Sequence, residues 1–429
     1  MKHTVEEIQL SNGAKGLLVN IPDASVMTFE LNFRAGEYLL SKDKWETAHL
    51  MEHILLGANE LYPRARDFQA EVEKNGAYSN ASTGVYDITY EAECADFEWE
   101  RVLSLVCLAI TKPLFLESEF QAEFGNVREE LTARSNNHFR YLGLALREKY
   151  GLCALTDQER LRIMQNVTLA DVKAHYGLTH TPDNMRFVIA GNIDKARVET
   201  IKKILSNLEL PQGEGRKQLP QEVPTTLPKP LYLEVPGVDN MYFYMDTFIK
   251  RWMKNEEIDA LSLANNMLTE TLHSRIFGAA REQGLVYGMS SSYTRWGDGS
   301  NWWFGAQIRP ENVAKLFDIM TREITNLRQG KVSDEDILGA KQYALGRFQR
   351  SAQTVSGTAN GYSNRYFFDD EIEDYYEIPK RIEAVTKKNM LEITNAFFTE
   401  NVNGFGVLGT CGEEFTKESY KHLSNLWKS

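Results

Sequence analysis

His49, Glu52 and His53 place two imidazoles and a carboxylate within one short stretch of the chain. The apolar residues around them recur at helical spacing, so residues 45–58 are predicted to form a helix. Residues four apart lie one turn apart on the same helix face, and both imidazoles can therefore point at one ion. Zinc binds imidazole and carboxylate groups, and its catalytic sites combine three protein ligands with a water. The pattern indicates a zinc site in which Glu52 takes a proton from that water. The other interpretation is structural, because two partly buried histidines on an amphipathic helix would produce the same pattern.

A third ligand should be a carboxylate or a histidine on another element. Residues 118–134 are predicted to form a long helix, and within it Glu123 and Glu130 lie seven residues apart and so share a face. A solvated acidic helix is the other interpretation, because Glu119 and Glu129 are also present. The spacing alone leaves both interpretations open.

Other elements must position this helix. Residues 27–33 alternate between apolar and polar side chains, which is typical of a half-buried strand. Residues 78–94 are rich in Tyr, Thr and Val around Thr83-Gly84 and are predicted to form a β-hairpin. A further helix is predicted over residues 139–150.

The two halves of the chain resemble each other. Val167-Thr168 opens a predicted helix that leads to a strand ending at Gly191, and Val385-Thr386 opens one that leads to a strand ending at Gly409. The differences 385 − 167 and 409 − 191 both equal 218, which indicates a duplicated, domain-sized unit. A strand at residues 241–248 would then correspond to the strand at residues 27–33.

A segment rich in proline and glycine separates these halves at residues 211–237. We therefore expect a first domain over residues 1–210, a linker over 211–237 and a homologous domain without metal over 238–429. The predicted fold class is α+β: two homologous domains, each a mixed or antiparallel sheet with helices on one face.

Composition excludes several classes of protein. The 429 residues carry 48 basic and 60 acidic side chains, a net charge of -12, which argues against a nucleic-acid partner. No apolar run is long enough to span a membrane. The first ten residues lack the pattern of a secretory signal, and the four cysteines form no CxxC pair, so a cytoplasmic location is expected.

Several further motifs resemble those of the pitrilysin/insulysin/mitochondrial processing peptidase family, whose inverted zincin signature is HxxEH. The 77-residue spacing from His53 to Glu130 is also similar. The other matching segments are Leu10-Ser11-Asn12-Gly13, Arg34-Ala35-Gly36, Gly76 with Asn80-Ala81-Ser82-Thr83 and Thr89-Tyr90, and Ser274-Arg275-Ile276-Phe277 with Arg281-Glu282 and Gly284-Leu285-Val286-Tyr287. One departure is that only Gln283 separates Arg281-Glu282 from Gly284, where the family usually has two residues.

The resemblance implies roles for particular residues. It makes His49, His53 and Glu130 the ligands of one zinc ion per chain, with Glu52 as the general base and Glu123 supporting the ligands. Asn80 and Ala81 would lie on a sheet edge that pairs with an extended peptide. Arg281 and Tyr287 would donate hydrogen bonds to the substrate and to the developing oxyanion.

The resemblance also implies a function. It predicts a zinc metalloendopeptidase, a hydrolase that degrades unfolded peptides inside an enclosed chamber. The longest family members build such a chamber from four homologous domains, so a two-domain chain should form a homodimer or a heterodimer with a related subunit. The alternatives are a non-catalytic assembly or interaction subunit of the same fold, and a catalytic subunit that needs a separate partner bearing the Arg/Tyr pair.

Overall fold

The computed structural model describes residues 1–213 and 215–427 of the chain. These residues divide into two compact units. Unit 1 comprises Met1–Thr132, Gln158–Leu219 and Gln349–Tyr375, and unit 2 comprises Ala133–Asp157, Pro220–Phe348 and the described residues from Tyr376 onward. Each unit thus contains one segment from the other half of the sequence. The boundaries predicted at residues 210 and 238 concern the repeat in the sequence, and they remain a prediction.

Unit 1 is built on a six-stranded mixed sheet with the strand order β1-β2-β6-β3-β5-β4. β2 and β6 are parallel, and all the other neighbours are antiparallel. β4 is the last strand in this order and so forms one edge of the sheet. The strands are β1 (Thr4–Gln9), β2 (Lys15–Asn20), β3 (Val26–Phe33), β4 (Tyr78–Thr83), β5 (Ile88–Ala95) and β6 (Met185–Gly191), which confirms the predicted strand and hairpin.

Unit 2 repeats this topology in a five-stranded sheet with the order β7-β11-β8-β10-β9. β7 and β11 are parallel, as β2 and β6 are in unit 1, and the other neighbours are antiparallel, so these five strands match β2, β6, β3, β5 and β4 in order and direction. The predicted pair of homologous α+β domains is confirmed. The strands are β7 (Leu231–Glu234), β8 (Met241–Ile249), β9 (Met289–Trp296), β10 (Gly299–Ile308) and β11 (Val402–Gly409), so the predicted linker contains a short strand.

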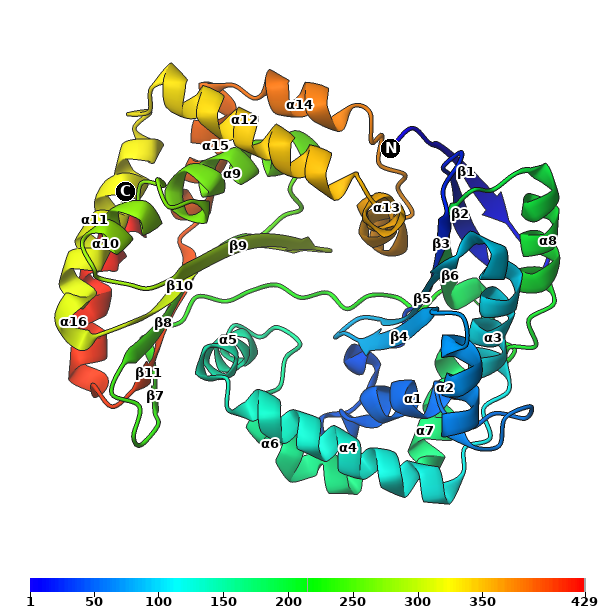
Figure 1. Ribbon diagram of the computed structural model, residues 1–429. Coiled ribbons are helices and arrows are strands. Elements are labelled where there is room, and N and C mark those ends of the chain that lie inside the picture. The colour runs from blue at the N-terminus through cyan, green and yellow to red at the C-terminus, as the bar shows by residue number, and fades with distance from the viewer. Residues whose placement is uncertain (214, 428–429) are drawn as a thin grey trace. The chain divides into compact units, whose positions relative to one another are not determined.

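Helices cover one face of the sheet in unit 1, and a single helix from the C-terminal half lies on the other face. Figure 1 shows α3 and α8 on one side of the strands and α13 beside β3 and β6 on the other. The helices of this unit are α1 (Thr47–Leu55), α2 (Ala65–Glu73), α3 (Trp99–Thr111), α7 (Leu169–Thr179), α8 (Lys195–Ser206) and α13 (Val355–Asp369), together with most of α4 (Glu117–Ser135) and of α6 (Asp157–Ile163).

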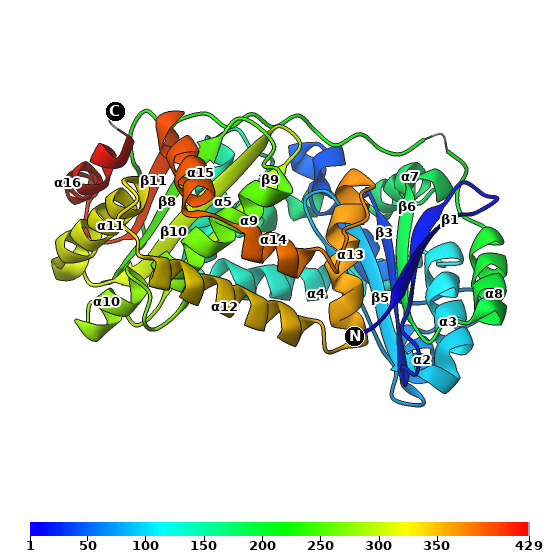
Figure 2. The same ribbon diagram turned by 90° about the horizontal axis from the view of Figure 1, so that it is seen from above.

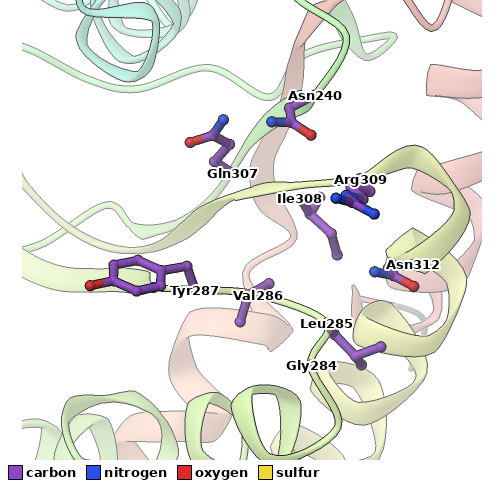
Figure 3. A pocket seen from close by; sticks show the side chains of 10 residues that line it. Asn240, Gly284, Leu285, Val286, Tyr287, Gln307, Ile308, Arg309 and Asn312 are labelled. Atoms are coloured by element: carbon purple, nitrogen blue, oxygen red, sulfur yellow. The ribbon is translucent and has the colours of Figure 1, made fainter.

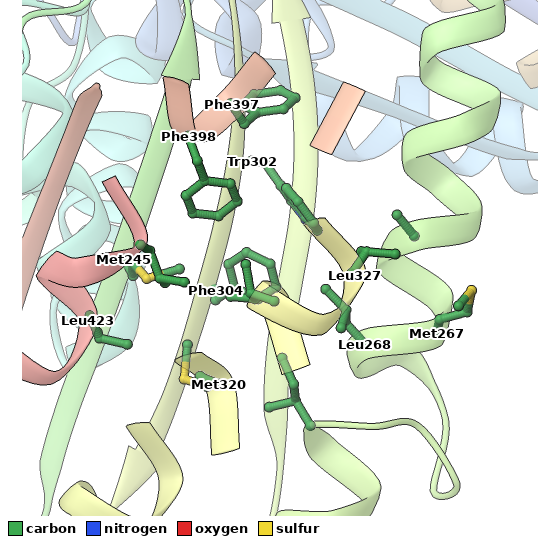
Figure 4. Close-up of a cluster of buried hydrophobic side chains, with 14 of the residues drawn as sticks. Met245, Met267, Leu268, Trp302, Phe304, Met320, Leu327, Phe397, Phe398 and Leu423 are labelled. Carbon is green, nitrogen blue, oxygen red and sulfur yellow. The ribbon is translucent and has the colours of Figure 1, made fainter. Parts of the chain in front are cut away.

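Unit 2 has the same plan, with α11 and α16 on one face of its sheet and α5 packed on β8 and β11 (Figure 2). Apolar side chains, including Trp302, Phe304 and Phe397, fill the space between sheet and helices (Figure 4). The helices are α5 (His138–Lys149), α9 (Asn255–Asn265), α10 (Phe277–Glu282), α11 (Val313–Arg328), α14 (Ile378–Ala384), α15 (Lys387–Thr399) and α16 (Glu413–Ser424), together with most of α12 (Asp334–Ser351).

The predicted repeat is also visible at two helix starts. Thr168 and Thr386 each cap the helix that follows, and each forms a capping box with the third residue of that helix. Both helices lead into the strand that ends at the corresponding glycine. In the described part of the chain, no helix has both the length and the apolar character needed to cross a bilayer.

A buried carboxyl group in unit 2 predicts how stability changes with pH. Asp246 accepts hydrogen bonds from Tyr150 Oη at 3.0 Å and Asn301 Nδ2 at 3.2 Å, and burial raises its pKa to about 7. The unfolded chain loses this proton near pH 4, so stability should fall as pH rises from about 4 to about 7 and then level off. Asp246→Asn should remove that dependence. Denaturant unfolding at pH 5 and pH 8 tests this, with exposed Asp239→Asn as the control; equal pH dependence in both variants would contradict it.

Candidate active site

The predicted HxxEH segment forms α1, whose apolar residues Leu50, Met51 and Ile54 are fully buried. The helix packs against α7 and against the edge strand β4. This packing fixes the rotation of the helix, so His49 and His53 point together from one side of it, with their ring centroids 5.0 Å apart.

Glu130 on α4 meets both imidazoles. Its Oε2 atom lies 3.3 Å from His49 Nε2 and 3.5 Å from His53 Nε2. Three donors bound tetrahedrally to zinc at about 2.1 Å would lie about 3.4 Å from one another. These separations therefore suit a single ion bound by the three side chains.

Each imidazole is oriented from behind by a second carboxylate. His53 Nδ1 lies 2.9 Å from Glu123 Oε2, and His49 Nδ1 lies 3.2 Å from Glu46 Oε2. A carboxylate on the far nitrogen fixes the tautomer and ring orientation of a metal-binding histidine. Sequence reasoning found Glu123 but missed Glu46, although its position three residues before His49 places it one turn away on the same helix face.

Glu46 belongs to a buried ion network that sequence reasoning did not find. The Arg160 guanidinium pairs with Glu46 and with Glu37, and it lies 2.8 Å from Glu37 Oε1. Burial alone would raise the pKa of Glu46, but its hydrogen bonds and ion pairs with His49 and Arg160 outweigh burial and lower this pKa to about 2. No local pattern links Arg160 to α1, because the contact is made only in the folded chain.

Glu52 lies beside the imidazoles but has a different partner. Its Oε2 atom accepts a hydrogen bond from Thr83 Oγ1 at 3.2 Å, at the end of β4. Burial raises its pKa, which is typical of a group that must hold a proton during a reaction. Its carboxylate and one nitrogen of each imidazole all lie within 4.8 Å of one another, so Glu52 is close to the space that an ion bound by the two histidines would occupy.

The charges of the site favour a cation. Burial lowers the pKa of His53, but hydrogen bonds to Glu123 and Glu130 outweigh it and raise the pKa to about 10. The carboxylates of Glu123 and Glu130 would also stabilise a bound dication, because it carries positive charge as the protonated His53 ring does. The donor types, their separations and the surrounding charge therefore all fit zinc.

The predicted peptide-binding residues lie on the strand next to this helix. Asn80 is exposed and Ala81 is buried on β4, the edge strand of the sheet. An edge strand presents unpaired N–H and C=O groups that an extended peptide can complete.

Arg281 and Tyr287 lie in unit 2, where the structure brings them together. The Arg281 side chain donates to the backbone carbonyl of Tyr287, and its guanidinium lies 4.8 Å from the ring centroid. The short spacing is accommodated by the end of α10, where Gly284 at φ +68° bonds to Arg281 O and Leu285 bonds to Ala280 O.

Tyr287 also borders a cavity of approximately 650 Å³ in unit 2. In Figure 3 its ring extends from the same segment as Leu285 and Val286, while Gln307 and Arg309 belong to the neighbouring strand region. The Tyr287 side chain is 88% exposed, so its hydroxyl is accessible to a ligand.

Two family models match the chain. Residues 17–152 match "Insulinase (Peptidase family M16)" and residues 166–343 match "Peptidase M16 inactive domain". The zinc protease PqqE of Helicobacter pylori is 26% identical over 46% of this chain and 46% of its own length. The uncharacterized zinc protease YmxG of Bacillus subtilis is 19% identical over 92% of this chain and 96% of its own. The chain thus spans about half the length of the first relative but nearly all of the second.

Solved structures agree with these matches. A protease from Helicobacter pylori superposes with a TM-score of 0.83 at 18% identity, over 95% of this chain and 100% of that one. A peptidase M16 inactive domain from Pseudomonas fluorescens gives 0.81 at 17% identity, over 95% and 99%. Together, the HxxEH helix, the paired α+β sheets and the two family models show that the chain belongs to the insulinase family of peptidases, family M16.

Proposed function

We propose that the chain is a zinc-dependent endopeptidase that hydrolyses peptide bonds in extended peptides. The observation that carries this proposal is the position of Glu130 Oε2, 3.3 Å and 3.5 Å from the two imidazole nitrogens. A pair of histidines that were only structural would not require a shared carboxylate and a second carboxylate behind each ring.

His49, His53 and Glu130 would hold one zinc ion per chain. When bound, the ion supplies Lewis-acid chemistry that polarises the scissile carbonyl and makes a water nucleophilic near neutral pH. Glu52 is placed to accept the proton of the attacking water and to pass it to the leaving amine. Thr83 holds the Glu52 carboxylate in place during both transfers.

The substrate would bind as an added strand. Asn80 and Ala81 on β4 offer backbone groups to an extended peptide, and α1 carries the metal site beside that strand. Only a segment that can adopt an extended conformation would fit, so unfolded peptides are the substrate class.

A direct test compares one cleavable sequence in two settings. The purified chain should cleave a quenched fluorescent peptide and should leave the same sequence intact inside a stably folded host protein. Unfolding the host by a destabilising core mutation should restore cleavage. Equal cleavage of the folded and unfolded hosts would contradict recognition of an extended backbone.

We further propose that the active form is a dimer, in which Arg281 and Tyr287 complete the site of the partner subunit. The family resemblance implies that the corresponding Arg/Tyr pair of the four-domain relatives lies in their last domain. In a two-domain chain that domain would come from a second copy. The contact between Arg281 and Tyr287 and the exposure of the tyrosine ring support a functional pair.

Mixed dimers test this arrangement. Glu52→Gln and Arg281→Ala should each be nearly inactive as pure homodimers, because an oxyanion donor contributes roughly 2.7–4 kcal/mol. Co-expression should produce mixed dimers in which one site has both residues intact. Random mixing makes about half of the dimers mixed, so roughly a quarter of wild-type activity should return. No recovery despite demonstrated subunit exchange would place the pair in the same chain as its zinc site.

A further inference from the structure

Three arginines of unit 1 hold the C-terminal end of α13 on the sheet. Arg34 Nη2 donates to the backbone carbonyl of Phe368 at 2.8 Å. Arg186 Nε and Arg216 Nη1 lie 2.6 Å and 2.9 Å from Oδ1 of Asp370, the residue that caps the helix. Hydrogen bonds from a guanidinium to a carboxylate or to the carbonyls at a helix end are strong and directional. They therefore define where the last turn of α13 lies on unit 1.

The end of α13 contacts the turn between β4 and β5. The ring of Phe368 lies 6.0 Å from the ring of Tyr86 in that turn, and the two planes are perpendicular. Edge-to-face packing is a geometry that aromatic rings prefer. Tyr86 also lies 6.0 Å from the ring of Tyr38, which follows β3 in the chain. The turn is thus packed against a helix that the second half of the sequence supplies to unit 1.

The segment that follows β3 contacts the same turn through its backbone. The Tyr38 N–H donates to the carbonyl of Val85 at 2.9 Å. A Cβ atom at Gly36 would lie 2.4 Å from that carbonyl oxygen, so only a glycine permits this close approach. Arg34, which bonds to the end of α13, lies two residues before Gly36. One short segment therefore connects α13 and the turn.

This turn begins at a residue that contacts the proposed general base. Thr83 is the last residue of β4, and its hydroxyl donates to Glu52 Oε2 at 3.2 Å. The turn closes directly after it, where the Gly84 N–H donates to the carbonyl of Asp87 at 2.8 Å. A displacement of the turn would carry Thr83 with it and would weaken its bond to Glu52.

From these contacts we propose that Phe368 is a positioning residue for the reaction. Its ring holds the β4–β5 turn in place, and the turn keeps Thr83 against the Glu52 carboxylate. This rests on the proposed function, since it concerns the residue assigned there as the general base. The second half of the sequence thus contributes to the catalytic centre of its own chain through α13.

A kinetic comparison tests the role of the ring. Phe368→Ala should lower kcat by about tenfold and leave KM and zinc content near wild-type values, because a small displacement of a catalytic group slows the chemical step. Phe368→Tyr keeps the ring and should recover most of the lost rate. Phe97→Ala removes the same side chain from an exposed site of unit 1 and should retain wild-type kcat. Tyr366→Phe, which removes a hydroxyl bond from α13 to Glu7, should retain it as well.

A double-mutant cycle tests the route through Thr83. Thr83→Val removes the hydroxyl that bonds to Glu52. If Phe368 acts through this hydroxyl, the double variant should be no slower than Thr83→Val alone, because the two residues then belong to one path. Losses that multiply in the double variant would overturn this route, and wild-type kcat in Phe368→Ala would overturn the proposal as a whole.

Hydrogen exchange provides a measurement that does not depend on activity. Phe368→Ala should speed the exchange of backbone amides in residues 83–88 and 36–40, while the amides of α1 exchange as in the wild-type chain. Unchanged exchange in the turn would overturn the proposal. Faster exchange in the turn, together with no peptide cleavage by the wild-type chain, would instead contradict the proposed peptidase and leave the contact between α13 and the turn intact.

Discussion

Replacing Glu52 with glutamine is expected to abolish peptide hydrolysis while zinc content and fold are retained. The loss of a general base typically costs about 10²–10⁴ in rate, and more where the base also positions the water. Glutamine keeps an oxygen that can accept the hydrogen bond from Thr83, so the local structure should persist. Because Glu52 is buried and not part of the Glu130 contact, the neutral amide should not disturb the three proposed ligands.

The measurement combines kcat/KM for a quenched peptide with zinc content by elemental analysis and the melting temperature. Glu60→Gln provides a matched control, since Glu60 is exposed on the loop after α1 and undergoes the same charge change. The control should retain wild-type activity. Wild-type activity in Glu52→Gln would remove this residue from the mechanism.

Replacing any one of His49, His53 and Glu130 with alanine is expected to lower zinc content sharply and abolish hydrolysis. Three protein ligands leave little redundancy, because two would have to hold the ion without the third. Folding should survive, because α1 is held by the buried residues on its other side and the unit has its own core.

The matched control for Glu130→Ala is Glu129→Ala on the same helix, whose side chain is exposed. Circular dichroism and zinc content of both variants, purified in parallel, provide the comparison. If Glu129→Ala or Glu123→Ala lost zinc while Glu130→Ala kept it, the assignment of the third ligand would be wrong.

Much of this site could be predicted from local pattern. The positions of His49, Glu52 and His53 on one helix follow from spacing, because helix periodicity is a local property. Spacing alone did not distinguish Glu130 from Glu123, since both share a face of α4. The folded chain separates them by which imidazole nitrogen each one reaches.

Other features could not be predicted from the sequence pattern, because they depend on contacts between distant segments. Arg160 contacts Glu46 across 114 residues, and nothing in its own segment indicates that partner. The same limit applies to α5, which the sequence predicts as a helix without indicating which face of the sheet the helix covers. The pairing of Glu30 with Glu91 likewise depends on strand register, which the alternating pattern does not define across two strands.

The most direct test of the account is a zinc titration of the purified chain after chelation. The amount of bound zinc and the rate of peptide hydrolysis should rise together, and both should level off when one zinc is bound per chain, with no other protein added. Hydrolysis that is unaffected by zinc removal, or one bound zinc per chain without any hydrolysis of flexible peptides, would contradict the proposal that this site is a catalytic zinc centre.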